Sequence, residues 1–143
     1  MHDAAVKLLR LRGRKVCDRV LWKGKVWKGQ IMFIRWLPGA PSHPAAHARE
    51  EAVYVGTLAS RKLSKKAVER NRMRRRCREA LRIVLKEYAP RNSEMSVQLL
   101  LCPRSPSLHA SFHLLREDIE RFLSTLPSQW PRRNHHPSSS SSS

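Results

Sequence analysis

Apolar residues near the start of the chain recur at helical spacing and then give way to strand-like runs. Residues 14–21 place Val16, Cys17, Val20 and Leu21 at that spacing, which predicts a short helix. Residues 26–37 are rich in β-branched and aromatic side chains and predict a strand, with Gly29 as a turn or a bulge. Residues 52–59 predict a further strand.

The second half of the chain predicts two amphipathic helices around one strand. Residues 66–88 contain no Gly or Pro, and their apolar side chains form one stripe at helical spacing: Met73, Cys77, Ala80, Leu81, Val84 and Tyr88. Residues 96–102 form a mostly apolar run that predicts a buried strand. A second stripe predicts the last helix: Phe112, Leu115, Ile119, Phe122 and Leu126. We expect Glu117, Asp118 and Glu120 on the solvated face of that helix.

This order of elements predicts an α+β domain with its helices packed against one face of a sheet. We expect the domain to cover residues 14–126. Residues 1–13 look like a flexible, basic N-terminus. Residues 127–143 form a Ser-rich tail without apolar periodicity, which we expect to be disordered.

The net charge changes this picture of an ordinary small domain. Twenty-nine Lys and Arg residues against eleven Asp and Glu give a formal charge of +18. So large an excess disfavours a typical small-molecule enzyme and points to a polyanion as the partner. No apolar run approaches the roughly 20 residues that cross a bilayer, and Met1–Lys7 lacks the apolar core of a signal peptide. We therefore expect a nucleic acid rather than a membrane as the partner.

The excess charge is concentrated in two segments of the chain. Residues 1–35 carry ten basic side chains against two acidic ones, and residues 60–78 carry ten against Glu69 alone. Ten like charges in such a short stretch repel one another too strongly to be explained as a solvated helix face. The second segment overlaps the start of the long predicted helix, where side-chain cations and free N–H groups favour phosphate.

The residues that usually carry catalysis or bind metals are sparse. Cys17, Cys77 and Cys102 show no CxxC spacing, which favours reduced thiols in a cytoplasmic protein. No pair of carboxylates has a spacing suited to a two-metal nuclease. His109 and His113 are one helical turn apart but lack a third ligand nearby. We expect neither a catalytic residue nor a metal site on this chain.

The segment 59–80 closely resembles the signature of the protein subunit of bacterial ribonuclease P. In that family a Ser-x-Lys stretch ends a strand, and an Arg-Asn-Arg motif follows on a helix. The matching residues are Ser60, Lys62, Ala67, Val68, Arg70, Asn71, Arg72, Arg74, Arg75, Arg78 and Glu79. The flanking segments agree as well, so the resemblance covers roughly residues 8–125.

The resemblance implies a more specific fold than the pattern alone predicts. It implies a four-stranded sheet with helices in the order α-β-β-β-α-β-α, a fold shared with a domain of a ribosomal protein. The βαβ crossover of that fold is left-handed, against the usual rule. Nothing in composition or periodicity indicates this handedness.

The resemblance also implies a function and a set of contact residues. The family's protein binds a catalytic RNA and contacts the 5′ leader of precursor tRNA, while the RNA hydrolyses the bond with bound magnesium. The implied contacts with RNA are Arg70, Asn71, Arg72, Arg74, Arg75 and Arg78, together with Lys62, Lys65 and Lys66. The implied cleft for the leader is lined by Ser60, Phe33, Cys17 and Leu21. The protein itself then needs no cofactor, and its partners are the catalytic RNA and precursor tRNA.

This sequence departs from the family where Cys17 and Leu21 replace aromatic residues on the first helix. Phe33, Trp36 and Tyr54 on the predicted strands are other rings on which a base can stack. Two other classes remain open. One is a ribosomal or ribosome-associated protein, and the other is a DNA-binding helix protein or a protein-only nuclease. A strand rather than a recognition helix follows the long helix, which disfavours the DNA-binding class.

Overall fold

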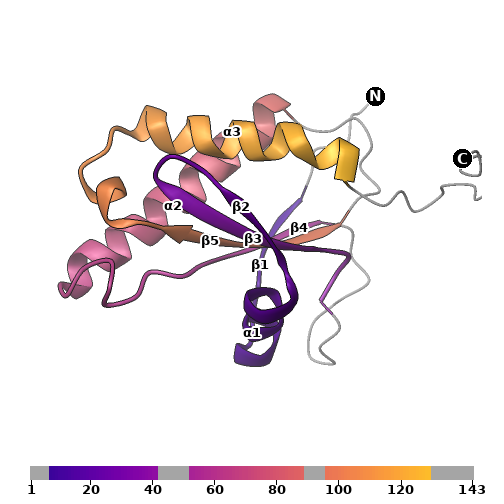
Figure 1. Cartoon of the computed structure of the whole chain (residues 1–143), viewed down its shortest axis with the longest axis horizontal. Coiled ribbons are helices and arrows are strands. Elements are labelled where there is room, and N and C mark those ends of the chain that lie inside the picture. Colours follow the sequence, from indigo (N-terminus) through magenta and orange to yellow (C-terminus); the bar gives the residue numbers. More distant parts are fainter. Residues whose placement is uncertain (1–6, 42–51, 89–95, 130–143) are drawn as a thin grey trace, which may run out of the picture.

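The computed structural model describes residues 7–41, 52–88 and 96–129, which form one mixed sheet and three α-helices. The sequence of elements, shown in Figure 1, is β1 (Leu8–Arg10), α1 (Arg14–Lys23), β2 (Lys25–Lys28), β3 (Met32–Pro38), β4 (Val53–Thr57), α2 (Ala67–Tyr88), β5 (Val97–Pro103), a short 3-10 helix η1 (Ser105–Leu108) and α3 (Phe112–Gln129). All three predicted helices are present. The predicted strand at 26–37 is a hairpin of β2 and β3, and Gly29 lies in its turn, where its N–H donates to the Met32 carbonyl at 2.8 Å.

The sheet has five strands in the order β1-β4-β5-β3-β2, so the expectation of four strands was wrong. The fifth strand, β1, lies within the segment 1–13 that we expected to be flexible. It pairs in parallel with β4, and β4 pairs in parallel with β5, whereas β3 is antiparallel to both β5 and β2. Two backbone hydrogen bonds flank the β1 pairing, from Val53 to the Lys7 carbonyl and from Leu11 to the Val55 carbonyl, each 2.9 Å.

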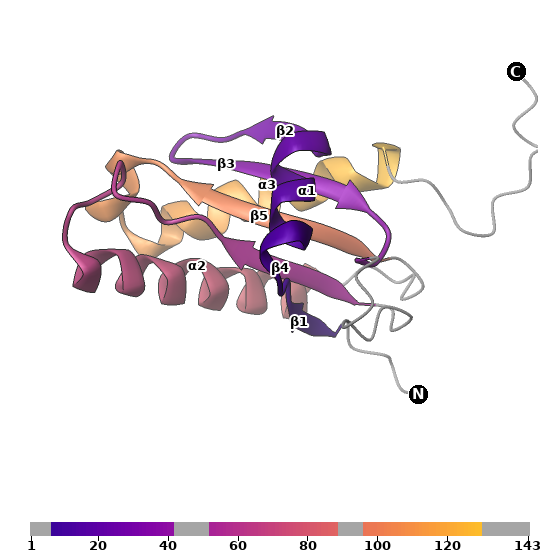
Figure 2. The ribbon, with the colours of Figure 1, turned by 90° about the horizontal axis from the view of Figure 1, so that it is seen from below.

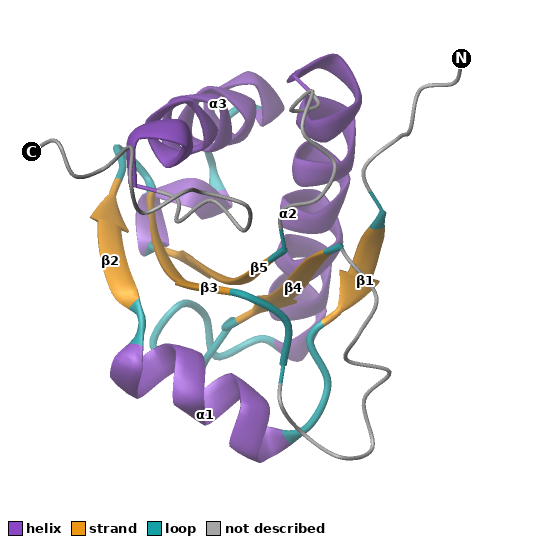
Figure 3. Cartoon of the chain, turned by 90° about the vertical axis from the view of Figure 1, so that its right-hand side faces the viewer, coloured by secondary structure: helices purple, strands orange, loops and turns teal. Residues whose placement is uncertain are grey.

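Helices cover both faces of this sheet, so the expectation of helices on a single face was also wrong. Figure 3 shows α2 and α3 on one side and α1 on the other, and Figure 2 shows α1 lying across the strands. The strand β5 is buried along almost its whole length, as a central strand with both faces covered must be. Along β3, buried Met32, Ile34 and Trp36 face α2 and α3, while the residues between them face α1.

Two clusters of buried side chains correspond to these two faces. The larger one lies between the sheet and the helices α2 and α3, and it contains the apolar stripes of both helices. The smaller one lies under α1: Leu11, Val16, Val20, Ala52, Tyr54 and Leu100, with Cys17, Leu21, Leu37 and Cys102 packed at its border. At the end of α1, a Cβ on Gly24 would lie 2.4 Å from the Val20 carbonyl oxygen, so only glycine fits this tight turn into β2.

Asp118 is fully buried, and the expectation that it lies on the solvated face of the last helix was wrong. Its Oδ1 accepts the backbone N–H of Gln30 at 3.0 Å, and its Oδ2 accepts that of Ile31 at 2.9 Å. The carboxylate therefore fastens α3 to the turn between β2 and β3. Its neighbours Glu117 and Glu120 are partly exposed, as expected.

The C-terminal boundary differs slightly from the predicted one. Helix α3 continues to Gln129, three residues beyond the predicted end of the domain at 126. The expected disorder of the tail therefore concerns 130–143, which lie outside the described residues. Between β4 and β5, the chain crosses over through α2, and the left-handedness of this crossover stays a prediction of the resemblance.

Candidate nucleic-acid interface

The orientation of α2 is fixed by its apolar stripe, which leaves most of its cationic residues outside the core. Met73, Cys77, Ala80, Leu81 and Val84 are all buried against the sheet and α3. The cations lie in the first half of the helix, as the sequence predicted. Glu69 in the first turn partly offsets them, and its carboxylate accepts the Ser64 hydroxyl at 2.6 Å. The start of α2 is thus a fixed, strongly positive end of the molecule.

Two of the predicted contact residues also hold the connection between β4 and α2 in place. The Arg70 guanidinium donates to the carbonyls of Ser64 at 3.0 Å and Lys65 at 3.1 Å. Arg74 donates to the Asn71 side chain at 2.6 Å and to the Ala59 carbonyl at 3.1 Å. A guanidinium has five N–H donors, so both residues keep donors available for a phosphate.

Two other cations of the motif are directed at solvent. Arg72 and Arg75 are exposed and make no hydrogen bond or ion pair within the part of the chain that the structure describes. The side chains of Lys62, Lys65 and Lys66 are exposed in the same way along the connection before α2. These five side chains are therefore available to a polyanion without breaking an existing contact.

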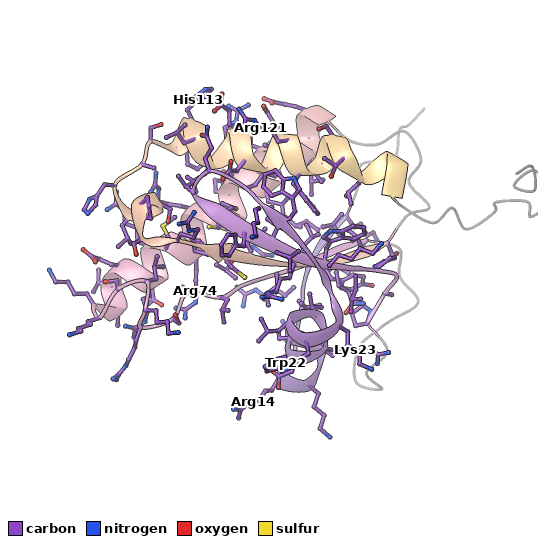
Figure 4. The ribbon with its side chains drawn as sticks, in the orientation of Figure 1. Arg14, Trp22, Lys23, Arg74, His113 and Arg121 are labelled. Carbon is purple, nitrogen blue, oxygen red and sulfur yellow. The ribbon has the colours of Figure 1, made fainter. Side chains whose placement is uncertain are left out.

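The predicted cations do not share one surface. At 3.6 residues per turn, Arg72 lies almost opposite Arg74 on the helix and one turn from Arg76. Arg76 donates to the carbonyls of Ser107 at 3.3 Å and Ala110 at 2.8 Å, so it fixes the segment between η1 and α3. In Figure 4, Arg74 lies on the α1 side of the sheet. The motif thus presents cations on two flanks of α2.

A further cation, Arg10, joins the flank that carries Arg78. The pKa of Arg78 is lowered, first by burial and second by the positive charge of Arg10 on β1. The two like charges add to the positive potential on this flank, which favours an anion there. Sequence reasoning missed Arg10 because it assigned residues 1–13 to a flexible segment, and the strand Leu8–Arg10 is too short to show a pattern.

The predicted leader-binding residues come mostly from one face of the sheet, the one that α1 partly covers. Cys17, Leu21 and Cys102 pack at the border of the buried cluster under α1, and Phe33 is the direct register partner of Cys102 across β3 and β5. Ser60 is exposed beyond the end of β4, where its hydroxyl accepts the N–H of Lys62 at 3.2 Å, and it is not part of this cluster. Three of the four predicted residues thus lie on the same side of the sheet.

Of the three candidate rings Phe33, Trp36 and Tyr54, only that of Phe33 is accessible for stacking on a base. Trp36 is buried on the opposite face, with its ring centroid 6.1 Å from that of Phe122, and Tyr54 is buried under α1. Phe33 is only half-buried, and the guanidinium of Arg104 lies 5.2 Å from its ring centroid. Arg104 was not predicted, and it supplies a cation and a second flat surface beside the ring.

Other chemistry is scarce in the described residues. They contain no group of three or more His, Cys, Asp or Glu side chains that could hold a metal ion. His113 lies 3.6 Å from Glu117 instead. Burial raises the pKa of the Cys77 thiol to about 12 and that of Cys102 to about 11, which keeps both thiols protonated near neutral pH. Within the described ranges, no helix is long and apolar enough to span a bilayer.

Comparison with known sequences identifies relatives of this chain. A family profile described as Ribonuclease P matches residues 6–127. A Ribonuclease P protein component from Prochlorococcus marinus is 34% identical over 118 residues, which cover 80% of this chain and 90% of the relative. Another from Thermus aquaticus is 33% identical over 120 residues, covering 84% of this chain but 61% of that longer relative.

Solved structures share the fold at lower sequence identity. The RNase P protein from Thermotoga maritima is 21% identical and superimposes with a TM-score of 0.60, covering 80% of this chain and 94% of that one. The RNase P protein from Staphylococcus aureus is 16% identical, with a TM-score of 0.57 and a coverage of 80% and 92%. The α+β arrangement described above is therefore that of RNase P proteins.

Proposed function

Because this chain belongs to the ribonuclease P protein family, we propose that it assembles with a ribonuclease P RNA and assists removal of the 5′ leader from precursor tRNA. The observation that carries this proposal is the presence of two different surfaces. One is the exposed cationic part of α2 and the connection before it, and the other is the half-buried ring of Phe33 beside α1. An RNA held by the first would leave the second for a separate strand.

The cationic surface is suited to the phosphates of a structured RNA. Arg72 and Arg75 have free guanidinium groups, and a guanidinium grips a phosphate through two parallel hydrogen bonds. Each phosphate neutralised releases condensed counterions, so binding weakens as salt increases. Such cations also replace magnesium in screening packed phosphates, and we therefore infer that the protein lowers the magnesium concentration that the RNA requires.

The face beside α1 is suited to an unpaired strand. Phe33 offers a ring that tolerates any base, and Arg104 beside it can stack on the same base or pair with the adjoining phosphate. Cys17 and Leu21 supply an apolar border. On this account the single-stranded leader of precursor tRNA runs over this face. The chemistry of cleavage belongs to the RNA and its magnesium ions.

The test is a comparison of two variants that each affect one surface. Arg72→Ala combined with Arg75→Ala should weaken assembly with a bacterial ribonuclease P RNA by about 1–3 kcal/mol for each charge-assisted contact. Phe33→Ala should leave assembly nearly unchanged while the complex loses about 1–3 kcal/mol of its preference for precursor over mature tRNA. Filter binding with labelled RNA and labelled tRNA measures both quantities.

Arg121→Ala is the matched control, because it removes one exposed cation from α3, on the far side of the sheet from α1 (Figure 4). It should change both quantities little. Equal losses in both quantities from the α2 variant and from Phe33→Ala would mean that the two surfaces are not separate binding sites.

A further inference from the structure

The outer side of α1 carries an exposed tryptophan that neither proposed surface uses. Trp22 is 79% exposed, the most exposed of the large apolar side chains that the structure describes. It is five residues from Cys17, which places it on the other side of the helix from the sheet-facing residues. Figure 4 shows it on α1, away from α3 and its residues His113 and Arg121.

The residues around Trp22 are charged, and most of them are cations. Lys15, Asp18 and Arg19 lie seven, four and three positions before it and share its side of the helix. Lys23 follows it directly, and all four of these side chains are exposed. The other large exposed apolar residues of the described chain lie outside α1: Val26 on β2, Leu58 just after β4 and Val68 on α2.

This setting favours a nucleic-acid ligand over a protein ligand. The core of a protein interface is depleted of charge and combines several apolar side chains, whereas Trp22 stands alone among charges. A single aromatic ring in a cationic surrounding is how proteins bind unpaired nucleotides, since bases stack on the ring and phosphates pair with the cations. A folded protein gains nothing from exposing this ring to water.

We propose that Trp22 stacks on an unpaired nucleobase of bound RNA, with Lys15 and Lys23 near the adjoining phosphates. The two sides of α1 then bind different nucleotides, those of the leader over the sheet side and this base on the outer side. The inference rests on the proposed function for the identity of the RNA. The base belongs either to the ribonuclease P RNA or to the leader of precursor tRNA, and the experiment distinguishes the two.

The experiment compares Trp22→Ala, Trp22→Phe and the control His113→Ala, which alters an exposed ring on the opposite side of the sheet. Affinity is measured for a bacterial ribonuclease P RNA alone, and then for precursor and mature tRNA with the assembled complex. Trp22→Ala should weaken one of these interactions about 5-fold to 150-fold, and Trp22→Phe should recover most of the loss. Weaker assembly identifies the ribonuclease P RNA as the source, and weaker precursor binding alone identifies the leader.

Two further readouts separate stacking from other effects. Because tryptophan carries no charge, Trp22→Ala should leave the slope of log affinity against log salt unchanged, and its thermal midpoint should match that of the parent. Unchanged affinity for every RNA would overturn the inference, and so would loss of a dimer of the free protein without loss of RNA affinity. Failure of the parent protein to bind ribonuclease P RNA at all would instead contradict the proposed function.

Discussion

Replacing Asp118 with Ala should be among the most destabilising single changes in this fold, because its carboxylate is fully buried. The carboxylate accepts two backbone N–H groups, of Gln30 and Ile31, and the Ala variant leaves both donors without a partner. A hydrogen bond to a charged group contributes about 1.5–3 kcal/mol. Two such bonds set an upper limit near 6 kcal/mol, and relief from burying the charge reduces it. We expect a loss of about 3–4 kcal/mol.

Urea unfolding followed by circular dichroism measures this loss, and amide hydrogen exchange locates it. Asp118→Asn keeps the size of the side chain and one acceptor, so it should lose about half as much. Glu117→Ala is the matched control, because its partly exposed carboxylate pairs with no described side chain other than exposed His113, and it should change stability by less than about 0.5 kcal/mol. The Gln30 and Ile31 amides should exchange faster in Asp118→Ala alone. Equal stability of the Asp118 and Glu117 variants would refute the role assigned to this carboxylate.

The remaining predictions concern the division between structural and RNA-binding groups. Arg76→Ala should lower stability by about 1–3 kcal/mol in urea unfolding because it loses two carbonyl partners, whereas Arg75→Ala should leave stability unchanged and weaken RNA binding. A thiol reagent at pH 8 should leave Cys77 and Cys102 unmodified in the folded protein, because their raised pKa values keep the thiolate scarce until the pH rises toward 11. Denaturant should expose both thiols to the reagent. Rapid labelling of the folded protein would contradict this prediction. Deletion of residues 130–143 should leave the thermal midpoint of unfolding unchanged. If the slope of log RNA affinity against log salt concentration is also unchanged, this segment adds no phosphate contact.

The elements that sequence alone predicted well are those with a single buried stripe. Residues 73–88 of α2 repeat apolar side chains at one spacing for about four turns, so the helix and its buried side follow from the pattern. Strand β1 was missed because three residues cannot display a period, and its existence depends on a partner 45 positions away, with Leu8 paired to Val53.

Asp118 shows a signal that was present and not used. It lies three residues after Leu115 and four before Phe122, which places it beside the buried stripe rather than opposite it. We expected Asp118 on the solvated face because of its residue type, since carboxylates are rarely buried unless they are paired, and its position in the stripe was not considered. Its hydrogen-bond partners lie in the turn between β2 and β3, where Gln30 is 88 residues earlier in the chain, and no local sequence pattern reveals them.

The candidate site was predictable as a segment but not as a surface. The sequence predicted correctly that the cations lie on the first half of α2, but not that Arg70, Arg74 and Arg76 would also bind backbone carbonyls. These carbonyls belong to the loops before and after other elements, so they become visible only once the chain is folded. The contact between Arg104 and Phe33 is likewise visible only in the folded chain, because Arg104 follows β5 and Phe33 lies on the neighbouring strand β3.

We propose that this protein assists a catalytic RNA and does not itself cleave. The most direct test combines the full chain with a bacterial ribonuclease P RNA and a precursor tRNA at a magnesium concentration too low for the RNA alone. We predict that the combination releases the 5′ leader at the mature end, and that the protein without the RNA cleaves nothing at any magnesium concentration. Magnesium-dependent cleavage by the protein alone, or no stimulation of the RNA by the protein, would contradict the account.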